Sequence, residues 1–204
     1  MRVNEIFYSI QGEGRFTGTP SVFIRLSGCN LRCEFCDTEH QPYKDLTEDE
    51  IMQEIAKYPA KHIVITGGEP LLQLKGSFIE KLHRADKFVQ IETNGTRPLD
   101  EFHLTRIDWI TCSPKFEFCP NADIKLHHID ELKVVVKKGQ DMSKYDNIIA
   151  QEYYVQPCDV KDEKENAEIL AQAINFIKSH PKWKLSLQNL AYGCADISSH
   201  IHRP

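Results

Sequence analysis

Short apolar runs recur along the chain, and most are rich in β-branched residues and too short for helices. Runs of this kind at residues 21–28, 62–66, 88–93, 109–115, 131–137, 153–157 and 183–188 predict strands that end in loops. Between some of them the apolar spacing changes to three and four residues. Thr47 and Glu50 form a capping box that predicts a helix with Ile51 and Ile55 on its buried face, ending at Pro59. Further helices are predicted over residues 71–85 and 162–179.

The alternation of strand, loop and helix is typical of βαβ units and a mainly parallel sheet. A closed eight-fold barrel takes about 250 residues, whereas this chain has 204, and several of its predicted strands have no helix after them. We therefore predict an incomplete, partial TIM-type α/β barrel of about six mainly parallel strands with few helices. No linker or repeat divides the sequence, so residues 1–204 are interpreted as a single domain.

Composition excludes several classes of protein. The formal net charge of −5 argues against a dedicated nucleic-acid surface, which is usually basic. The first residues lack the apolar segment of a signal peptide, and no apolar run reaches the roughly 18 residues of a membrane span. The sequence predicts a cytoplasmic protein that binds neither membrane nor nucleic acid. Its seven cysteines are then expected to be thiols or metal ligands.

The unusual polar motifs all follow predicted strands. The cysteine-rich loop follows residues 21–28, GGEP follows 62–66, TNGT follows 88–92, SPK follows 109–112, and QPCD follows 153–156. In parallel α/β folds the functional site lies at the carboxyl ends of the strands. Five successive loops on one rim are expected to converge on one cavity.

The cysteine-rich loop has the spacing C-x3-C-x2-C, formed by Cys29, Cys33 and Cys36. Three thiolates can hold three corners of a [4Fe–4S] cluster and leave one iron open, which is the arrangement of a catalytic site. The alternative is a structural zinc site with a fourth ligand such as His40 or a remote cysteine, but no second C-x2-C knuckle is present. The remaining cysteines are expected to be packed thiols: Cys112, Cys119, Cys158 and Cys194.

With these residues in place, CNLRCEFC resembles the cluster loop of the radical S-adenosylmethionine (SAM) superfamily. Phe35 matches the aromatic residue that this superfamily carries beside the adenine of SAM, and residues 67–70 match the GGEP motif for the methionine amino group. The resemblance implies that SAM chelates the open iron. Reduction by the cluster then cleaves SAM to methionine and a 5′-deoxyadenosyl radical.

A longer block, NEIFYSIQGEGRFTGTPSVFIRLSGCNLRCEFCDT, is similar to the 7-carboxy-7-deazaguanine synthase family, and ETNGT, SPK and QP follow at similar spacings. The resemblance implies a carbon–nitrogen lyase that converts 6-carboxy-5,6,7,8-tetrahydropterin to 7-carboxy-7-deazaguanine and ammonia, a step in the biosynthesis of 7-deazapurines such as queuosine. It also implies Mg²⁺, a homodimer, and flavodoxin or ferredoxin as electron donor.

The same resemblance assigns residues. It implies cluster ligation by Cys29, Cys33 and Cys36, Mg²⁺ binding by Thr38, and no catalytic side chain, because the abstracting radical comes from SAM. The implied SAM-binding residues are Phe35, Gly67, Gly68, Glu69, Pro70, Gly95, Ser113, Pro114, Lys115, Gln156, Pro157, Cys158 and Asp159. The implied substrate-binding residues are Ile10, Gln11, Gly12, Glu13, Arg25, Thr93 and Pro204.

Some alternatives stay open at this stage. Arg25, inside an apolar strand, suits either the substrate carboxylate or a structural ion pair. After LSLQ the family continues T-H-K, whereas this chain reads NLAYGCADISSHIHRP, so His200, His202 or the terminal carboxylate of Pro204 would have to close the site. Two other functions are compatible with the cysteine loop: an activase that makes a glycyl radical on a protein partner, and a non-enzymatic zinc-binding module.

Overall fold

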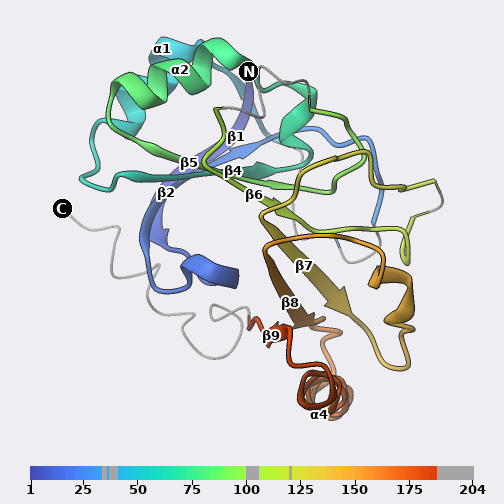
Figure 1. The fold of residues 1–204 in the computed structure, drawn as a ribbon. Helices are drawn as coiled ribbons and strands as arrows, with labels where there is room; N and C mark the ends of the chain where they lie inside the picture. Colours follow the sequence, from blue (N-terminus) through green and yellow to red (C-terminus); the bar gives the residue numbers. More distant parts are fainter. Residues whose placement is uncertain (34–35, 37–40, 100–105, 120, 188–204) are drawn as a thin grey trace.

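The computed structural model describes residues 1–33, 36, 41–99, 106–119 and 121–187. Within this part, nine strands form one sheet in the order β3-β1-β2-β4-β5-β6-β7-β8-β9 (Figure 1). The strands are β1 (Arg2–Ile10), β2 (Pro20–Leu26), β3 (Lys44–Asp45), β4 (His62–Gly67), β5 (Phe88–Thr93), β6 (Trp109–Cys112), β7 (Glu131–Val136), β8 (Glu152–Pro157) and β9 (Trp183–Leu185).

Each strand from β2 onward in this order runs parallel to its neighbour, whereas β1 is antiparallel to both β2 and β3. The sheet has two edges, β3 and β9, so it is an open barrel, as the sequence predicted. The strand count is higher than the predicted six, partly because the sequence pattern did not predict β1. Most residues of β1 are only half-buried, with Val3 its one buried position, so its hydrophobic signal is weak.

Three α-helices lie in the described residues: α1 (Glu48–Ile55), α2 (Gly76–Arg84) and α4 (Glu163–Ser179). The predicted capping box is confirmed, because Thr47 Oγ1 accepts from the Glu50 N–H and Glu50 accepts from the Thr47 N–H. The helix predicted over 71–85 begins later, after the 3₁₀ turn η2 (Pro70–Leu72). Two other 3₁₀ turns are η1 (Gly14–Phe16) and η3 (Ser143–Tyr145).

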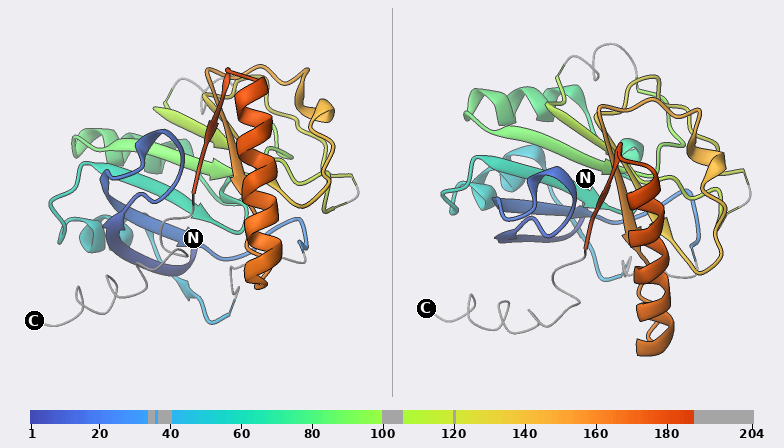
Figure 2. Two further views of the ribbon diagram at one scale, coloured as in Figure 1. Left: turned by 90° about the horizontal axis from the view of Figure 1, so that it is seen from below. Right: turned by 60° about the horizontal axis from the view of Figure 1, so that its bottom comes forward.

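The helices cover one face of the sheet. Figure 1 shows α1 and α2 side by side over β4 and β5, and α4 lies against β8 and β9, as both views of Figure 2 also show. Apolar side chains from both layers form the core between them: Val22, Ile24, Ile51, Ile55, Ile63, Ile65, Phe78, Ile79, Leu82 and Ile91. No helix in the described part of the chain is long and apolar enough to cross a membrane.

The opposite face, which is the concave interior of the barrel, is polar. Parallel register places Arg25, Glu92 and Thr111 on one side of their strands, opposite the core residues Ile24 and Ile91. Because the helices bury the alternate residues of the same strands, the polar set is left to line the interior. The fold therefore concentrates polar chemistry at the inner surface and at the carboxyl ends of the strands.

Candidate functional site

The cysteine loop begins directly after β2. Cys29 and Cys33 are half-buried, and Cys36 is exposed. The Sγ of Cys29 accepts hydrogen bonds from the Leu31 N–H at 3.4 Å and from Asn94 Nδ2 at 3.8 Å. The Cys36 N–H donates to the Cys33 carbonyl at 3.2 Å, which turns the chain between the two. N–H donors aimed at a sulfur atom are the surroundings that metal-bound thiolates use.

The donor set of the loop fits a [4Fe–4S] cluster, because three thiols lie within one short segment and the loop supplies no fourth. Burial raises the pKa of Cys29, and burial together with the Cys119 contact raises the pKa of Cys33 to about 12. Binding of metal would therefore displace protons from these thiols. Within the described ranges, no three His, Cys, Asp or Glu side chains are grouped closely enough to hold a metal ion.

A fourth thiol lies beside the loop. Cys119 is 6% exposed, its Sγ is 3.4 Å from the Cys33 Sγ, and it donates to the Arg32 carbonyl at 3.4 Å. The sequence predicted a packed thiol at this position, and its burial confirms that. Its closeness to Cys33 had no signal in the sequence, because 86 positions separate the two residues.

The glycines of GGEP press their backbone against the cysteine loop. The Gly68 N–H donates to the Leu26 carbonyl, and the Glu69 N–H donates to the Gly28 carbonyl, both at 2.9 Å. A Cβ at Gly68 would lie 2.0 Å from the Gly28 oxygen, and Gly67 has φ +113° with equally little room. These glycines are therefore required by the contact between two protein loops, whether or not a ligand is also near.

The carboxylate of Glu69 is fully buried and holds GGEP to the loop after β5. Its Oε1 accepts from Thr93 Oγ1 at 2.8 Å and from the Leu71 N–H at 3.0 Å, and its Oε2 accepts from the Asn94 N–H at 2.8 Å. Burial raises the pKa of Glu69, and the three donors oppose that rise. The side chain faces inward, so any contact of residue 69 with a ligand falls to its backbone.

Two more predicted loops join this rim. The Ser113 N–H donates to the Thr93 carbonyl at 2.8 Å, and Lys115 Nζ donates to Ser113 Oγ at 2.6 Å. Gly95 has φ +78°, and a Cβ there would lie 2.6 Å from the Cys112 Sγ. The loops after β2, β4, β5 and β6 are thus brought together, as the sequence predicted from their positions.

The loop after β8 contributes in part. Gln156 Oε1 accepts from Ser186 Oγ at 2.8 Å, and that hydroxyl also accepts from the Gly14 N–H at 3.1 Å, so Gln156 lies within the barrel interior. Cys158 is buried. Asp159, in contrast, pairs with Lys161 at 2.6 Å, which lowers the pKa of that carboxyl to about 2. The carboxylate of Asp159 is therefore engaged within its own loop.

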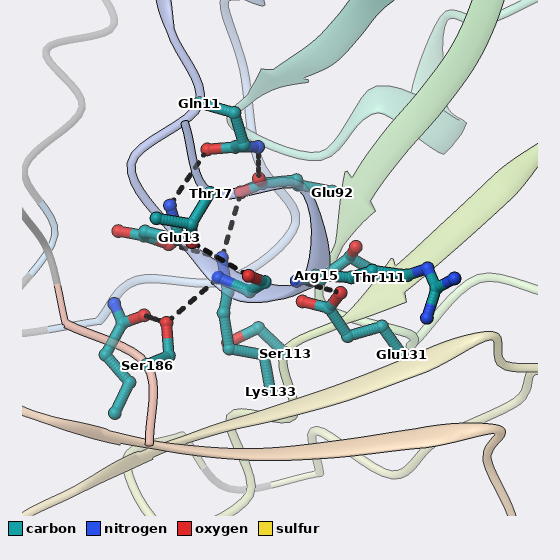
Figure 3. A network of polar contacts seen from close by, with 12 residues as sticks. Gln11, Glu13, Arg15, Thr17, Glu92, Thr111, Ser113, Glu131, Lys133 and Ser186 are labelled. Carbon is teal, nitrogen blue, oxygen red and sulfur yellow. Dashed lines mark hydrogen bonds and ion pairs between the residues drawn. The ribbon is translucent and has the colours of Figure 1, made fainter. Parts of the chain in front are cut away.

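The loop after β1 enters the barrel interior and meets charged residues of β5 and β7 (Figure 3). Gln11 Nε2 donates to Glu92 Oε1 at 3.0 Å, and Gln11 Oε1 accepts from the Glu13 N–H at 3.2 Å. Lys133 Nζ contacts Glu13 Oε2 and lies 3.3 Å from Glu92 Oε2. Gln11 and Glu13, both predicted, therefore belong to a polar network with Glu92 and Lys133, which sequence reasoning missed.

A second buried carboxylate, Glu131, lies below the turn of QGEG. Its Oε2 accepts from the Arg15 N–H at 3.0 Å and from Trp109 Nε1 at 3.3 Å. A Cβ at Gly14 would lie 2.0 Å from Glu131 Oε1, which explains the second glycine of QGEG. The strand ELKVVV carried a signal for this network. Its charged residues Glu131 and Lys133 occupy alternate positions and so point to the same face, where burial requires that each has a partner.

Arg25 is paired with another residue of the chain. Its Nε lies 2.7 Å from Glu5 Oε1 on the neighbouring strand β1, and its guanidinium lies over the Phe7 ring at 5.8 Å. This is the structural ion pair that the sequence left open. The Arg25 side chain is 25% exposed, so part of it stays accessible beside this pair.

Of the remaining predicted positions, some lie in the described part of the chain and others do not. Ile10 is 45% exposed at the end of β1, and Gly12 follows it in the QGEG loop. Phe35, Thr38, His40 and Pro204, with the other residues of the carboxyl-terminal segment, lie outside the described residues.

Comparison with known proteins agrees with this geometry. Residues 23–115 match the model of the radical SAM superfamily. A 7-carboxy-7-deazaguanine synthase of Bacteroides thetaiotaomicron is 49% identical over 187 residues, which cover 92% of this chain and 94% of the relative. One from Burkholderia multivorans is 37% identical, with 93% and 96% covered. The crystal structure of QueE from Escherichia coli superposes with a TM-score of 0.75 at 26% identity, covering 91% of this chain and 92% of that one.

The two relatives are matched over nearly their whole length. Residues 23–115, which match the superfamily model, include the cysteine loop after β2 and the motifs that follow β4, β5 and β6. The radical SAM superfamily carries a [4Fe–4S] cluster and uses SAM, and the three thiols of this chain suit that cluster. The chain is therefore a member of the 7-carboxy-7-deazaguanine synthase family of radical SAM enzymes.

Proposed function

We propose that this chain is a radical SAM lyase that converts 6-carboxy-5,6,7,8-tetrahydropterin to 7-carboxy-7-deazaguanine with release of ammonia, a step toward 7-deazapurines such as queuosine. The observation that carries the proposal is 49% identity to a relative of that name over almost the full length of both chains. The polar interior beside the cysteine loop supports it, because a small planar substrate with donors and acceptors needs such a lining.

In this proposal Cys29, Cys33 and Cys36 would hold the cluster, which together with SAM would supply the radical for hydrogen abstraction. The residues that would surround SAM are the backbone of 67–70, the loop residues Gly95, Ser113, Pro114, Lys115 and Cys158, and Gln156 and Pro157 at the end of β8. The substrate lies against Gln11, Gly12, Glu13, Thr93 and the accessible side of Arg25. The SAM-binding set is completed by Phe35 and Asp159, and the substrate-binding set by Ile10 and Pro204.

The remaining parts of the proposal rest on the family resemblance alone. Thr38 would offer its hydroxyl to Mg²⁺, a hard cation that prefers oxygen ligands. The active form would be a homodimer, and flavodoxin or ferredoxin would deliver the electron.

The test is an anaerobic assay. Protein reconstituted with iron and sulfide is mixed with SAM, dithionite and carboxytetrahydropterin, and the product is identified by mass. We expect carboxydeazaguanine and ammonia in equal amounts. A brown protein that cleaves SAM but leaves the pterin unchanged would contradict the substrate assignment. Purified protein that holds zinc and no iron would contradict the radical chemistry.

The position of Cys119 gives a further prediction. If the cluster takes only the three thiols of the loop, Cys119→Ser should retain full iron and sulfide content, because the hydroxyl preserves the hydrogen bond to the Arg32 carbonyl. Iron, acid-labile sulfide and visible absorbance of reconstituted protein check this. Loss of about one quarter of the iron or more would instead identify Cys119 as a fourth ligand.

A further inference from the structure

We propose that Lys133 is a positioning residue that holds Glu13 and Glu92 as a pair of carboxylates, and that this pair binds the N–H edge of the substrate's fused heterocycle. The inference rests on the proposed function for the class of substrate. A reduced pterin has a guanidine-like edge with several N–H donors, and acceptor-only groups are its natural partners.

Lys133 is the centre of the arrangement. It lies within β7, its side chain is 4% exposed, and its Nζ contacts one oxygen of Glu13 and one of Glu92 (Figure 3). Glu13 comes from the loop after β1, whereas Glu92 comes from β5. One buried ammonium therefore contacts two carboxylates from different segments, and Gln11 links the same segments through the Glu13 N–H and Glu92 Oε1.

The two carboxylates keep acceptor capacity. An ionised carboxylate offers about four acceptor sites, and Lys133 uses one oxygen of each. Gln11 Nε2 donates to Glu92 Oε1 at 3.0 Å and so uses one more acceptor site of that carboxylate. The side chains of Glu13 and Glu92 are 16% and 21% exposed, so each has an accessible edge, while the ammonium beneath them is shielded. A donor-rich ligand can approach them from the open side.

The charge balance favours such a ligand. Burial would raise the pKa of Glu13, but attraction and hydrogen bonding by Lys133, with a hydrogen bond from Gln156, lower it below its ordinary value. Burial alone would lower the pKa of Lys133, but Glu13, Glu92 and Glu131 raise it. The ammonium of Lys115 also lowers the pKa of Glu13.

Glu131 does not share this role. It is 1% exposed, and its carboxylate already accepts from the Arg15 N–H and from Trp109 Nε1. The accessible carboxylates are thus Glu13 and Glu92, which carry two negative charges against the single charge of Lys133. The excess negative charge faces the interior, where N–H donors are attracted and a carboxylate edge is repelled.

Lys133→Met tests the proposal by removing the charge while keeping a long apolar stem. Without the ammonium, burial and mutual repulsion raise the pKa of Glu13, so part of the pair is protonated near neutral pH. Reconstituted protein with SAM but no reductant allows the Kd for carboxytetrahydropterin to be measured by calorimetry without turnover. We expect the wild-type Kd to change little between pH 6.5 and 8.5, whereas the variant binds about 10-fold more weakly at pH 6.5 and recovers as the pH rises.

Lys184→Met is the matched control, because Lys184 on β9 pairs with Glu152 at the surface and its side chain is 53% exposed. It should bind as the wild type does. Glu92→Gln keeps the shape of the side chain and removes one charge, and it should weaken binding at every pH. This variant carries the test if Lys133→Met fails to fold.

A Lys133→Met protein with wild-type affinity would overturn the proposal, as would equal loss at all pH values or a Glu92→Gln variant that binds normally. These failures are distinct from failure of the proposed function. Wild-type protein that neither binds nor converts the pterin contradicts that function, whereas normal wild-type turnover with unaffected variants contradicts only the role of Lys133.

Discussion

Cys36→Ala is expected to abolish cluster assembly and turnover while leaving the fold intact. Cys36 is the exposed thiol of the loop, so its loss removes a proposed iron ligand and almost no buried surface. Two remaining thiols cannot hold three corners of a cube, so iron should fall well below about four per chain after reconstitution. Iron and sulfide analysis, visible absorbance and SAM cleavage measure the effect.

The matched control for this variant is Cys119→Ser, whose thiol lies 3.4 Å from the Cys33 Sγ yet is expected to be dispensable. Both variants should have wild-type far-UV circular dichroism before metal is added. A Cys36→Ala protein with a full cluster and normal SAM cleavage would remove the basis for the assignment of the loop.

Glu69→Ala is expected to cause the largest loss of stability, about 3–5 kcal/mol in the free energy of unfolding. The carboxylate is fully buried and accepts from Thr93 Oγ1, the Leu71 N–H and the Asn94 N–H. Alanine would leave these donors without an acceptor, and each buried unsatisfied group costs about 1–3 kcal/mol. Urea denaturation of the metal-free protein measures the change.

The free energy of unfolding of Glu69→Gln should lie between those of the wild type and of Glu69→Ala. Its carbonyl can still accept from Thr93 and Leu71, but its amide N–H₂ would meet the Asn94 N–H, so donor faces donor. Glu54→Ala is the control, because Glu54 forms an exposed surface pair with Lys57, and pairs of this kind contribute little to stability. A Glu69→Ala protein less than about 1 kcal/mol below the wild type would show that GGEP and the β5 loop are not held by this carboxylate.

The variants of Cys36 and Glu69 also distinguish metal binding from the contact between the loops of the rim. Cys36 is proposed as a metal ligand, whereas Glu69 joins the loops after β4 and β5. Glu69→Gln protein should therefore retain its three cluster thiols but bind SAM more weakly, because the backbone of residues 67–70 is less firmly placed against the Gly28 carbonyl.

Much of the site was predictable because it is encoded locally. The spacing of Cys29, Cys33 and Cys36 and the run GGEP each lie in one short segment, and strand order alone places such segments on one rim. The start of the helix at Thr47 and Glu50 is also encoded locally, because the hydrogen bonds of a capping box form within one turn. Strand β1, with one buried position, lacked such a signal.

The other determinants depended on side chains that meet across the sheet. Lys133 with Glu13, Cys119 with Cys33, and Arg25 with Glu5 are pairs of distant segments. The direction of Glu69, inward to Thr93 and Asn94, likewise follows from the packing of two loops.

By itself the sequence determined the order of strands, the thiol loop and the rim on which the polar loops end, because periodicity and motif spacing are properties of neighbouring residues. Only the tertiary structure decided which charges are paired, which thiol lies beside the loop and which carboxylates remain accessible in the interior. Those outcomes depend on register and burial, since a charged group is stable inside a protein only where the fold brings it a partner.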